Sequence, residues 1–255
     1  MSLAVTLMGT GTSTGVPRIA CDCPVCTSDD PRNRRLRAGV LLESGGGTAV
    51  IDTSPDLRQQ ALTHRIRRLD AILFTHPHAD HVYGLDDVRI FNFIQRRDLP
   101  CYGHPETLDA VRRYFSYVWE EGQRGGGKPV LRLVPVDGPF AEIGEQIVPL
   151  PARHGTMPVL GYRLRDFALL TDVSEIPQAT WPLLAGLDVL VLGALRYTPH
   201  PTHFNFEQAV EVARRIGARR TYLTHISHEV DHAAPRVALP DGVEIAHDGL
   251  RFEFA

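Results

Sequence analysis

The chain has 255 residues, of which 43% are hydrophobic and 22% charged, and its formal net charge is −3. This length can bury a large core, so we expect one domain over residues 1–255. The mildly acidic charge gives no global positive field, which disfavours nucleic acid as a partner. No segment approaches the roughly 20 apolar residues that cross a bilayer, and the amino terminus lacks the pattern of a secretory signal. We therefore expect a cytoplasmic protein without a membrane partner.

Short apolar runs along the chain predict strands that alternate with helices. The predicted strands cover residues 3–8, 38–43, 48–52, 70–75, 168–172, 188–193 and 220–224. Helical periodicity appears over 106–121 and 205–217, and Gly217 gives the second helix a natural stop. The glycine-rich stretch 121–129 predicts a mobile surface loop, either a plain connector or a lid over a site. This alternation indicates an α/β protein.

Residues 76–81, which directly follow the predicted strand 70–75, have the sequence HPHADH. Residues i and i+2 of an extended segment project to the same side, so His76 and His78 can bind one metal ion. After the chain turns, Asp80 and His81 can face a second ion. Four ligand types in six residues predict a metal site; the alternative is a polar turn that happens to collect histidines.

Three more potential ligands each follow an apolar run directly: His154, Asp172 and His225. Taken singly, each is better explained as a loop residue than as a ligand, but together with HxHxDH they complete an ordered set. Two divalent ions about 3.5–4 Å apart can activate a shared water and bind both the attacking and the leaving oxygen of a displacement. That is hydrolase chemistry. Five imidazoles and two carboxylates suit zinc, manganese or iron.

In this ordered set the chain resembles the metallo-β-lactamase superfamily over essentially its whole length. The resemblance implies a four-layer αββα sandwich with two metal ions between the carboxyl edges of its sheets. It implies that one ion is held by His76, His78 and His154, the other by Asp80, His81 and His225, and that Asp172 bridges them. Asp52 resembles a position that orients ligands, with a strand-end aspartate bonded to backbone as the alternative.

The glycine-rich stretch 8–17, MGTGTSTGVP, follows the first predicted strand. It matches neither the P-loop nor the GxGxxG pattern, which disfavours a nucleotide-cofactor loop. It resembles the opening of the phosphodiesterase branch of the superfamily, which contains ribonuclease Z and the PhnP-type cyclic phosphodiesterases. Exposed backbone amides in such a loop would suit phosphate oxygens.

Three of the four cysteines, Cys21, Cys23 and Cys26, lie within six positions, whereas Cys101 is distant, which disfavours a disulfide framework. In the PhnP-type enzymes a CxCxxC at this place binds a structural zinc, together with a histidine three residues beyond the last active-site histidine. Here that histidine is His228. A Cys₃His set is closed and leaves no open position for substrate. The alternative is three reduced thiols and a free surface histidine.

His203 precedes the predicted helix 205–217 and matches the residue that acts on the departing oxygen in the PhnP-type enzymes. Histidine can donate a proton near neutral pH, so we expect His203 to be the general acid, with an exposed loop histidine as the alternative. Asp80 is a second candidate for proton transfer, although it is already counted as a ligand.

The expected function is a binuclear metal-dependent phosphodiesterase that opens a small cyclic phosphate ester. The resemblance implies 5-phosphoribosyl 1,2-cyclic phosphate as substrate, ribose 1,5-bisphosphate as product, a role in phosphonate metabolism and a homodimer. Expected cofactors are two divalent ions (manganese, zinc or iron) and one structural zinc. A ribonuclease Z-like activity is disfavoured, because the 121–129 loop is too short for the tRNA-binding arm of that family. Lactone or thioester hydrolysis by the same metal pair, and a non-catalytic binding role, stay open.

Overall fold

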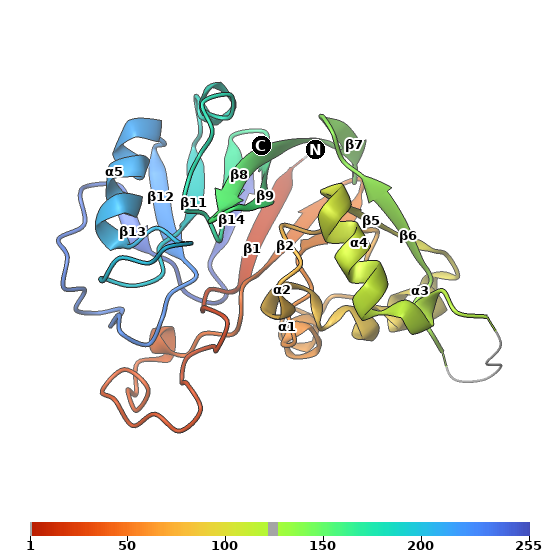
Figure 1. The fold of residues 1–255 in the computed structure, drawn as a ribbon, viewed down its shortest axis with the longest axis horizontal. Helices are drawn as coiled ribbons and strands as arrows, with labels where there is room; N and C mark the ends of the chain where they lie inside the picture. Colours follow the sequence, from red (N-terminus) through yellow and green to blue (C-terminus); the bar gives the residue numbers. More distant parts are fainter. Residues whose placement is uncertain (1, 122–126) are drawn as a thin grey trace.

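The computed structural model describes residues 2–121 and 127–255 and contains two mixed sheets (Figure 1). The first sheet has the strand order β14-β1-β2-β3-β4-β5-β6 and the second the order β13-β12-β11-β10-β9-β8-β7. The strands of the first sheet are β1 (Leu3–Gly9), β2 (Gly39–Ser44), β3 (Gly47–Ile51), β4 (Ala71–Leu73), β5 (Leu99–Gly103), β6 (Leu131–Pro135) and β14 (Arg251–Phe254). Those of the second are β7 (Phe140–Glu142), β8 (Glu145–His154), β9 (Met157–Leu164), β10 (Phe167–Leu170), β11 (Val189–Gly193), β12 (Arg220–Thr224) and β13 (Val243–Ile245).

Helices cover the outer faces of both sheets (Figure 1). The α-helices are α1 (Leu57–Thr63), α2 (Ala79–Val82), α3 (Arg89–Gln95), α4 (Pro105–Tyr114) and α5 (Phe206–Ile216). Short 3₁₀ turns occur at η1 (Pro31–Asn33), η2 (Leu85–Val88), η3 (Ser116–Val118) and η4 (Trp181–Leu184). A capping box at Asn205 and a left-handed Gly217 delimit α5, as expected from the sequence.

Three apolar cores lie between the four layers. The first lies between the two sheets and includes Tyr162 and Phe167, both fully buried. A second core joins the first sheet to α1, α3 and α4, and a third joins the second sheet to α5 through Phe206. This order of helix, sheet, sheet and helix confirms the predicted four-layer αββα sandwich.

Parallel pairing brings several strand ends to one edge of each sheet. Strand β3 runs parallel to β4, and β10, β11 and β12 run parallel to one another. Residues that follow these strands directly therefore emerge beside each other, where loops are free to carry functional side chains. The candidate ligands lie at these ends.

The helix predicted over 106–121 is shorter than expected. It ends at Tyr114, because Phe115 leaves the helical conformation (φ −115°, ψ 39°) and is buried in the core beside the first sheet. The aromatic residues that follow form η3 instead. Of the predicted loop 121–129, residues 122–126 lie outside the described part of the chain.

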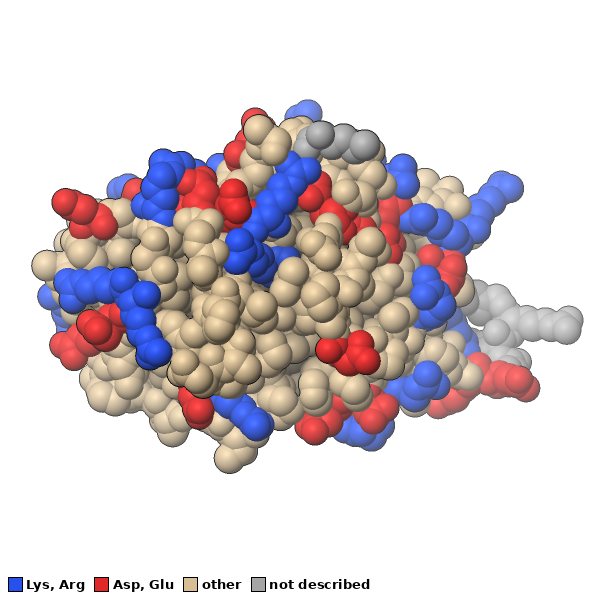
Figure 2. All heavy atoms as spheres, turned by 90° about the horizontal axis from the view of Figure 1, so that it is seen from above, with Lys and Arg blue, Asp and Glu red and all other residues tan. Residues whose placement is uncertain are grey.

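On the face shown in Figure 2, lysine and arginine side chains lie among aspartates and glutamates, and the described residues form no continuous basic surface there. Within residues 2–121 and 127–255, every helix is too short or too polar to cross a bilayer.

Candidate active site

The seven candidate ligands come together where the strand ends of the two sheets meet. Each lies at, or within three residues of, the end of β4, β8, β10 or β12, or at the start of α2, where His78 is the residue directly before the helix. Asp80 and His81 occupy the first turn of α2, and His154 is the last residue of β8. The site thus joins segments that are up to 149 residues apart in the sequence.

The candidate ligands form two groups, and within each group the donor atoms lie close enough together to bind one ion. His76, His78 and His154 have ring nitrogens within 4.8 Å of one another, and so do the ligand atoms of Asp80, His81 and His225. The Asp172 carboxylate lies between these groups, with Oδ1 3.2 Å from His225 Nε2 and Oδ2 3.3 Å from His81 Nε2. Two donors bound tetrahedrally at about 2.0–2.2 Å would be roughly 3.3–3.6 Å apart.

Buried nitrogen atoms without a partner indicate that the site is suited to metal ions. The Nε2 atoms of His76, His81 and His225 are buried, and no hydrogen bond satisfies them. Leaving such groups unpaired in the interior costs free energy unless they bind something. All three face the Asp172 carboxylate at 3.2–3.9 Å. The donor set therefore fits divalent cations.

A network of hydrogen bonds to the Nδ1 atoms fixes the orientation of two of the histidines. His81 Nδ1 donates to Asp52 Oδ2 at 2.7 Å, and the Thr75 hydroxyl donates to the same oxygen at 2.7 Å. Thr75 Oγ1 in turn lies 3.0 Å from His76 Nδ1 and can accept its proton. Asp52 thereby orients both rings so that their Nε2 atoms point into the site.

A third histidine, His154, is oriented by a backbone group. His154 Nδ1 donates to the carbonyl oxygen of Thr202 at 2.6 Å, which leaves His154 Nε2 for the site. Sequence reasoning missed both Thr75 and Thr202. Thr75 precedes His76 directly and offers a weak signal, whereas a main-chain carbonyl contributed by a distant loop leaves no mark in the sequence.

The electrostatics of the site favour added positive charge. Burial lowers the pKa of His76 well below its usual value. Burial alone would do the same to His81, but the Asp172 and Asp52 carboxylates raise the pKa of His81 well above its usual value. Burial would raise the pKa of Asp172, yet His225, His81 and His76 hold it well below the usual range. Anionic oxygens thus surround a cation-binding position.

Backbone strain is concentrated here. Asp52, Asp172 and His225 all have left-handed backbone conformations, with φ of 64°, 55° and 59°. Such conformations are costly for residues with a β-carbon and persist where the surrounding structure enforces them. In each case the residue lies within two positions of a strand end, and the turn aims its polar side chain toward the site.

His203 lies at the same site, although it is not one of the seven. Its Nδ1 is 3.7 Å from Asp172 Oδ1, and its ring centroid is 4.5 Å from that of His154 and 5.1 Å from that of His225. Burial, together with the neighbouring His225, lowers its pKa to about 3. The His200 ring lies 5.0 Å from that of His203, and its Nδ1 accepts a hydrogen bond from the Thr202 amide.

Cys21, Cys23, Cys26 and His228, here called the cysteine cluster, form a second group. Their ligand atoms lie within 4.8 Å of one another, and the Sγ atoms of Cys21 and Cys23 are each 3.4 Å from His228 Nδ1. Sulfur and nitrogen bound tetrahedrally to one zinc are roughly 3.5 Å apart. Burial raises the pKa of Cys23, but hydrogen bonds from the Cys26 amide and His228 bring it down to about 6. All four cysteines are free of disulfides.

Residues 10–12 of the glycine-rich loop do not offer the open amides that we expected. The Thr10 amide donates to Asp248, the Gly11 amide to Leu36 and the Thr12 amide to Ile226. The loop also pairs with Ile226, one residue beyond His225. These three amides are therefore used in bonds to other segments of the chain, and the expected phosphate cradle is wrong for residues 10–12.

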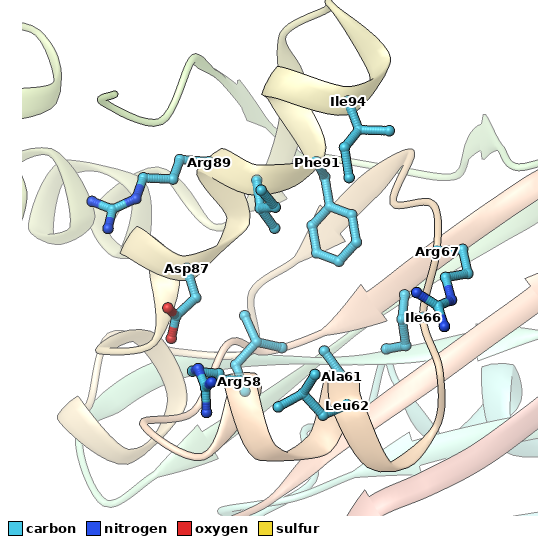
Figure 3. Close-up of a pocket in the computed structure, with 11 residues that line it drawn as sticks. Arg58, Ala61, Leu62, Ile66, Arg67, Asp87, Arg89, Phe91 and Ile94 are labelled. Atoms are coloured by element: carbon cyan, nitrogen blue, oxygen red, sulfur yellow. The ribbon is translucent and has the colours of Figure 1, made fainter. Parts of the chain in front are cut away.

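A hollow of 430 Å³ lies elsewhere, between α1 and α3 (Figure 3). Apolar side chains such as Ala61, Phe91 and Ile94 line it, with arginines at the rim. None of its lining residues is histidine or cysteine, so it offers no ligand set comparable to the site at the strand ends.

Known proteins similar to this chain agree with the architecture. A model of the beta-lactamase superfamily domain matches residues 48–226. The crystal structure of a diphosphatase from the PhnP family is 41% identical, with a TM-score of 0.93 over 100% of this chain and 98% of that one.

Two curated relatives are named for two different activities, and they match this chain over different shares of their own length. An octanoyltransferase of Porphyromonas gingivalis is 39% identical over 96% of this chain, but the match spans only half of that protein. Ribonuclease Z of Mycobacterium sp. (strain KMS) is 27% identical over 98% of this chain and 96% of its own length. The chain belongs to the metallo-β-lactamase superfamily, in its PhnP-type branch, and is a metal-dependent hydrolase.

Proposed function

We propose that the protein is a binuclear metal-dependent phosphodiesterase that hydrolyses a small phosphate ester. The observation that carries this proposal is the set of buried, unpaired Nε2 atoms that converge on Asp172. The 41% identity to a PhnP-family diphosphatase over the whole chain supports phosphate chemistry over the other reactions of the superfamily.

In this proposal one ion is held by His76, His78 and His154, the other by Asp80, His81 and His225, with Asp172 between them. Bound there, divalent ions supply Lewis acidity and activate a water at neutral pH. Asp52 and Thr75 orient two of these ligands, and the Thr202 carbonyl orients a third. Such outer contacts keep the ligands in a single geometry.

His203 is proposed to act on the departing oxygen. It lies on the Asp172 side of the site, 13% exposed, so it can reach both the ligands and a bound substrate. Burial disfavours its protonated form, and the negative charge of a phosphate ester bound beside it would oppose that effect. Proton donation matters most when the leaving group is a poor one, such as a ribose alkoxide.

The substrate that we propose is 5-phosphoribosyl 1,2-cyclic phosphate, opened to ribose 1,5-bisphosphate. Similarity to the PhnP family supports a compact phosphorylated sugar. The proposal includes zinc, manganese or iron in the seven-ligand site, a structural zinc in the cysteine cluster, and a single-domain, cytoplasmic homodimer. Light scattering after gel filtration tests the dimer.

The decisive experiment follows the cyclic phosphate by phosphorus NMR. Zinc-loaded wild-type protein, His203→Ala and the matched neighbour His200→Ala are each incubated with the substrate and then treated with a chelator. Wild type and His200→Ala should consume the cyclic resonance, and His203→Ala should leave it. Persistence of the resonance in all three samples would reject this substrate and direct the search to nucleotide diesters, RNA 3′ ends, lactones and thioesters.

Diphosphate hydrolysis is a second candidate, because the PhnP-family relative at 41% identity is described as a diphosphatase. The same site could act on a P–O–P linkage, whose leaving group is a phosphate that needs no proton. Turnover of ADP-ribose that survives His203→Ala, with no turnover of the cyclic ester, would favour this candidate.

A further inference from the structure

A hollow of 290 Å³ lies beside the seven-ligand site, and some of the residues that line it are direct neighbours of the ligands. One wall is Pro77, which stands between His76 and His78. Another consists of Met157 and Pro158, and Met157 pairs with His154 across the turn between β8 and β9. We call it the α4 hollow, because α4 forms its remaining side. Its size is at the lower end of pockets that hold small ligands.

The face of α4 that lines the hollow carries three charged side chains. Glu106, Asp109 and Arg113 are three to four residues apart and hence lie on one side of the helix, whereas Leu108 and Val111 face the core. All three charged residues are exposed, and within the described chain none makes a side-chain ion pair or hydrogen bond that would occupy it. A guanidinium binds phosphate, and carboxylates accept hydrogen bonds from sugar hydroxyls.

An exposed tyrosine of the hollow contacts a second exposed tyrosine outside it. Tyr114 lines the hollow and is 48% exposed. Its ring meets that of Tyr83 edge to face, with centroids 5.7 Å apart, and Tyr83 is 53% exposed. Tyr83 directly follows α2, which carries Asp80 and His81. Exposed aromatic rings beside a phosphate-processing site are suited to stacking against a nucleobase.

We propose that the α4 hollow binds the part of the substrate remote from the reacting phosphorus, and that this part is a nucleoside phosphate. Arg113 holds the second phosphate, Glu106 and Asp109 accept from sugar hydroxyls, and Tyr114 with Tyr83 stacks on the base. This inference rests on the proposed function and deepens it, since a bare phosphoribosyl group would leave both tyrosines unused. The substrate class thereby extends from the cyclic phosphoribosyl ester proposed above to esters of nucleoside phosphates.

Binding of AMP tests the hollow independently of turnover. Titration calorimetry on the zinc-loaded full chain compares wild type with Arg113→Gln and Tyr114→Ala, and inorganic phosphate serves as the second probe. Each variant should bind AMP about tenfold more weakly, the scale of losing one base stack or charged contact, and should bind inorganic phosphate like wild type.

Matched controls come from the same segment. Arg112→Gln removes a guanidinium that lies 5.0 Å from the Trp119 ring and does not line the hollow, and Tyr117→Ala removes an exposed tyrosine three residues further on. Both should bind AMP like wild type. An equal loss in these controls, or AMP binding no tighter than that of inorganic phosphate to wild type, would overturn the proposal.

Turnover separates a failure of the hollow from a failure of the proposed function. The p-nitrophenyl ester of thymidine 5′-monophosphate offers a base, and bis(p-nitrophenyl) phosphate offers none. Tyr114→Ala should raise KM about tenfold for the first ester and leave kcat/KM for the second unchanged. If wild type hydrolyses neither ester, the phosphodiesterase proposal fails while the AMP titration still decides the hollow. If both KM values stay unchanged, the hollow is rejected and the phosphodiesterase stands.

Discussion

The seven-ligand site takes its residues from the ends of β4, β8, β10 and β12 and from the short helix α2, whereas the cysteine cluster takes three of its four from residues 21–26, which contain neither helix nor strand. The strands that carry the first site are held in register by two sheets and by the core between them. The segment that carries the second is held by local turns and by the contacts of Cys21 and Cys23 with His228.

This difference separates two uses of a metal ion. Where the scaffold already places the ligands, an ion adds chemistry, and its loss should leave the fold in place. Where the ligands lie on irregular chain, an ion supplies the cohesion that a core would otherwise give, and its loss should appear as lost stability. Substitutions in the two regions should therefore affect different measurements.

Asp172→Asn should give the largest loss of activity. It removes the carboxylate that faces three histidines, so metal binding and turnover should both fail, with kcat/KM lower by more than about 1,000-fold, or about 4 kcal/mol of barrier. Rates on bis(p-nitrophenyl) phosphate and metal analysis by mass spectrometry measure this, with Asp166→Asn on the exposed turn before β10 as control. Near-normal turnover with two bound ions would contradict the role of Asp172.

Cys23→Ser should mainly reduce stability. With one thiolate gone from the cysteine cluster, we expect one zinc equivalent to be lost and the free energy of unfolding to fall by roughly 3 kcal/mol or more, which lowers Tm by roughly 6–12 °C. Calorimetry and zinc analysis check both. Cys101→Ala, in the core beside the first sheet, is the matched control and should keep its zinc. Unchanged zinc content in Cys23→Ser would show that the cluster holds no ion.

Asp52→Asn should have a smaller effect on the seven-ligand site. An amide keeps the volume but places a donor where Asp52 Oδ2 accepts from both His81 and Thr75. Metal affinity or kcat should fall about 10- to 100-fold, while unfolding remains cooperative. Competition with a fluorescent chelator gives the affinity, and Asp56→Asn, which disturbs only a contact with Arg37 outside the site, gives the baseline. Equal affinities would show that Asp52 orients nothing.

The strand ends explain why the sequence predicted so much of this site. HPHADH, His154, Asp172 and His225 each follow an apolar run, and their order alone identifies the fold. Strands β5 to β9 were not predicted, because their prolines and mixed patterns, as in Leu99–Gly103 and Glu145–His154, hide the alternation. Pairing with neighbours outweighs local preference in such segments.

Contacts between distant segments left no comparable signal. The α4 hollow brings Pro77, Met157 and Arg113 together, and only the packing of α4 on the first sheet makes them neighbours. The loop 8–17 shows the opposite error, since its glycines suggested a phosphate cradle, yet the amides of residues 10–12 bond to Asp248, Leu36 and Ile226. Glycine content indicates a tight turn without showing where the amides point.

The smallest effect concerns pH and the chain around the cysteine cluster. His232 Nδ1 lies 3.1 Å from Arg35 Nη2 and can accept its proton only while the imidazole is neutral. Burial, and then Arg35, lower the pKa of His232 to about 4, below the unfolded value of about 6.5. The folded state therefore binds this proton less readily than the unfolded chain, so stability is complete above pH 6.5 and falls as the pH drops toward 4.

In His232→Gln the side-chain oxygen can still accept from Arg35 and does not titrate. Urea unfolding at pH 7 and pH 5 should show the variant gaining on wild type by about 1 kcal/mol or less in acid, because the half-exposed imidazole is screened by water. Changes in metal binding are common to both proteins and cancel in the difference. A difference between them that is the same at both pH values would show that His232 does not titrate in this range.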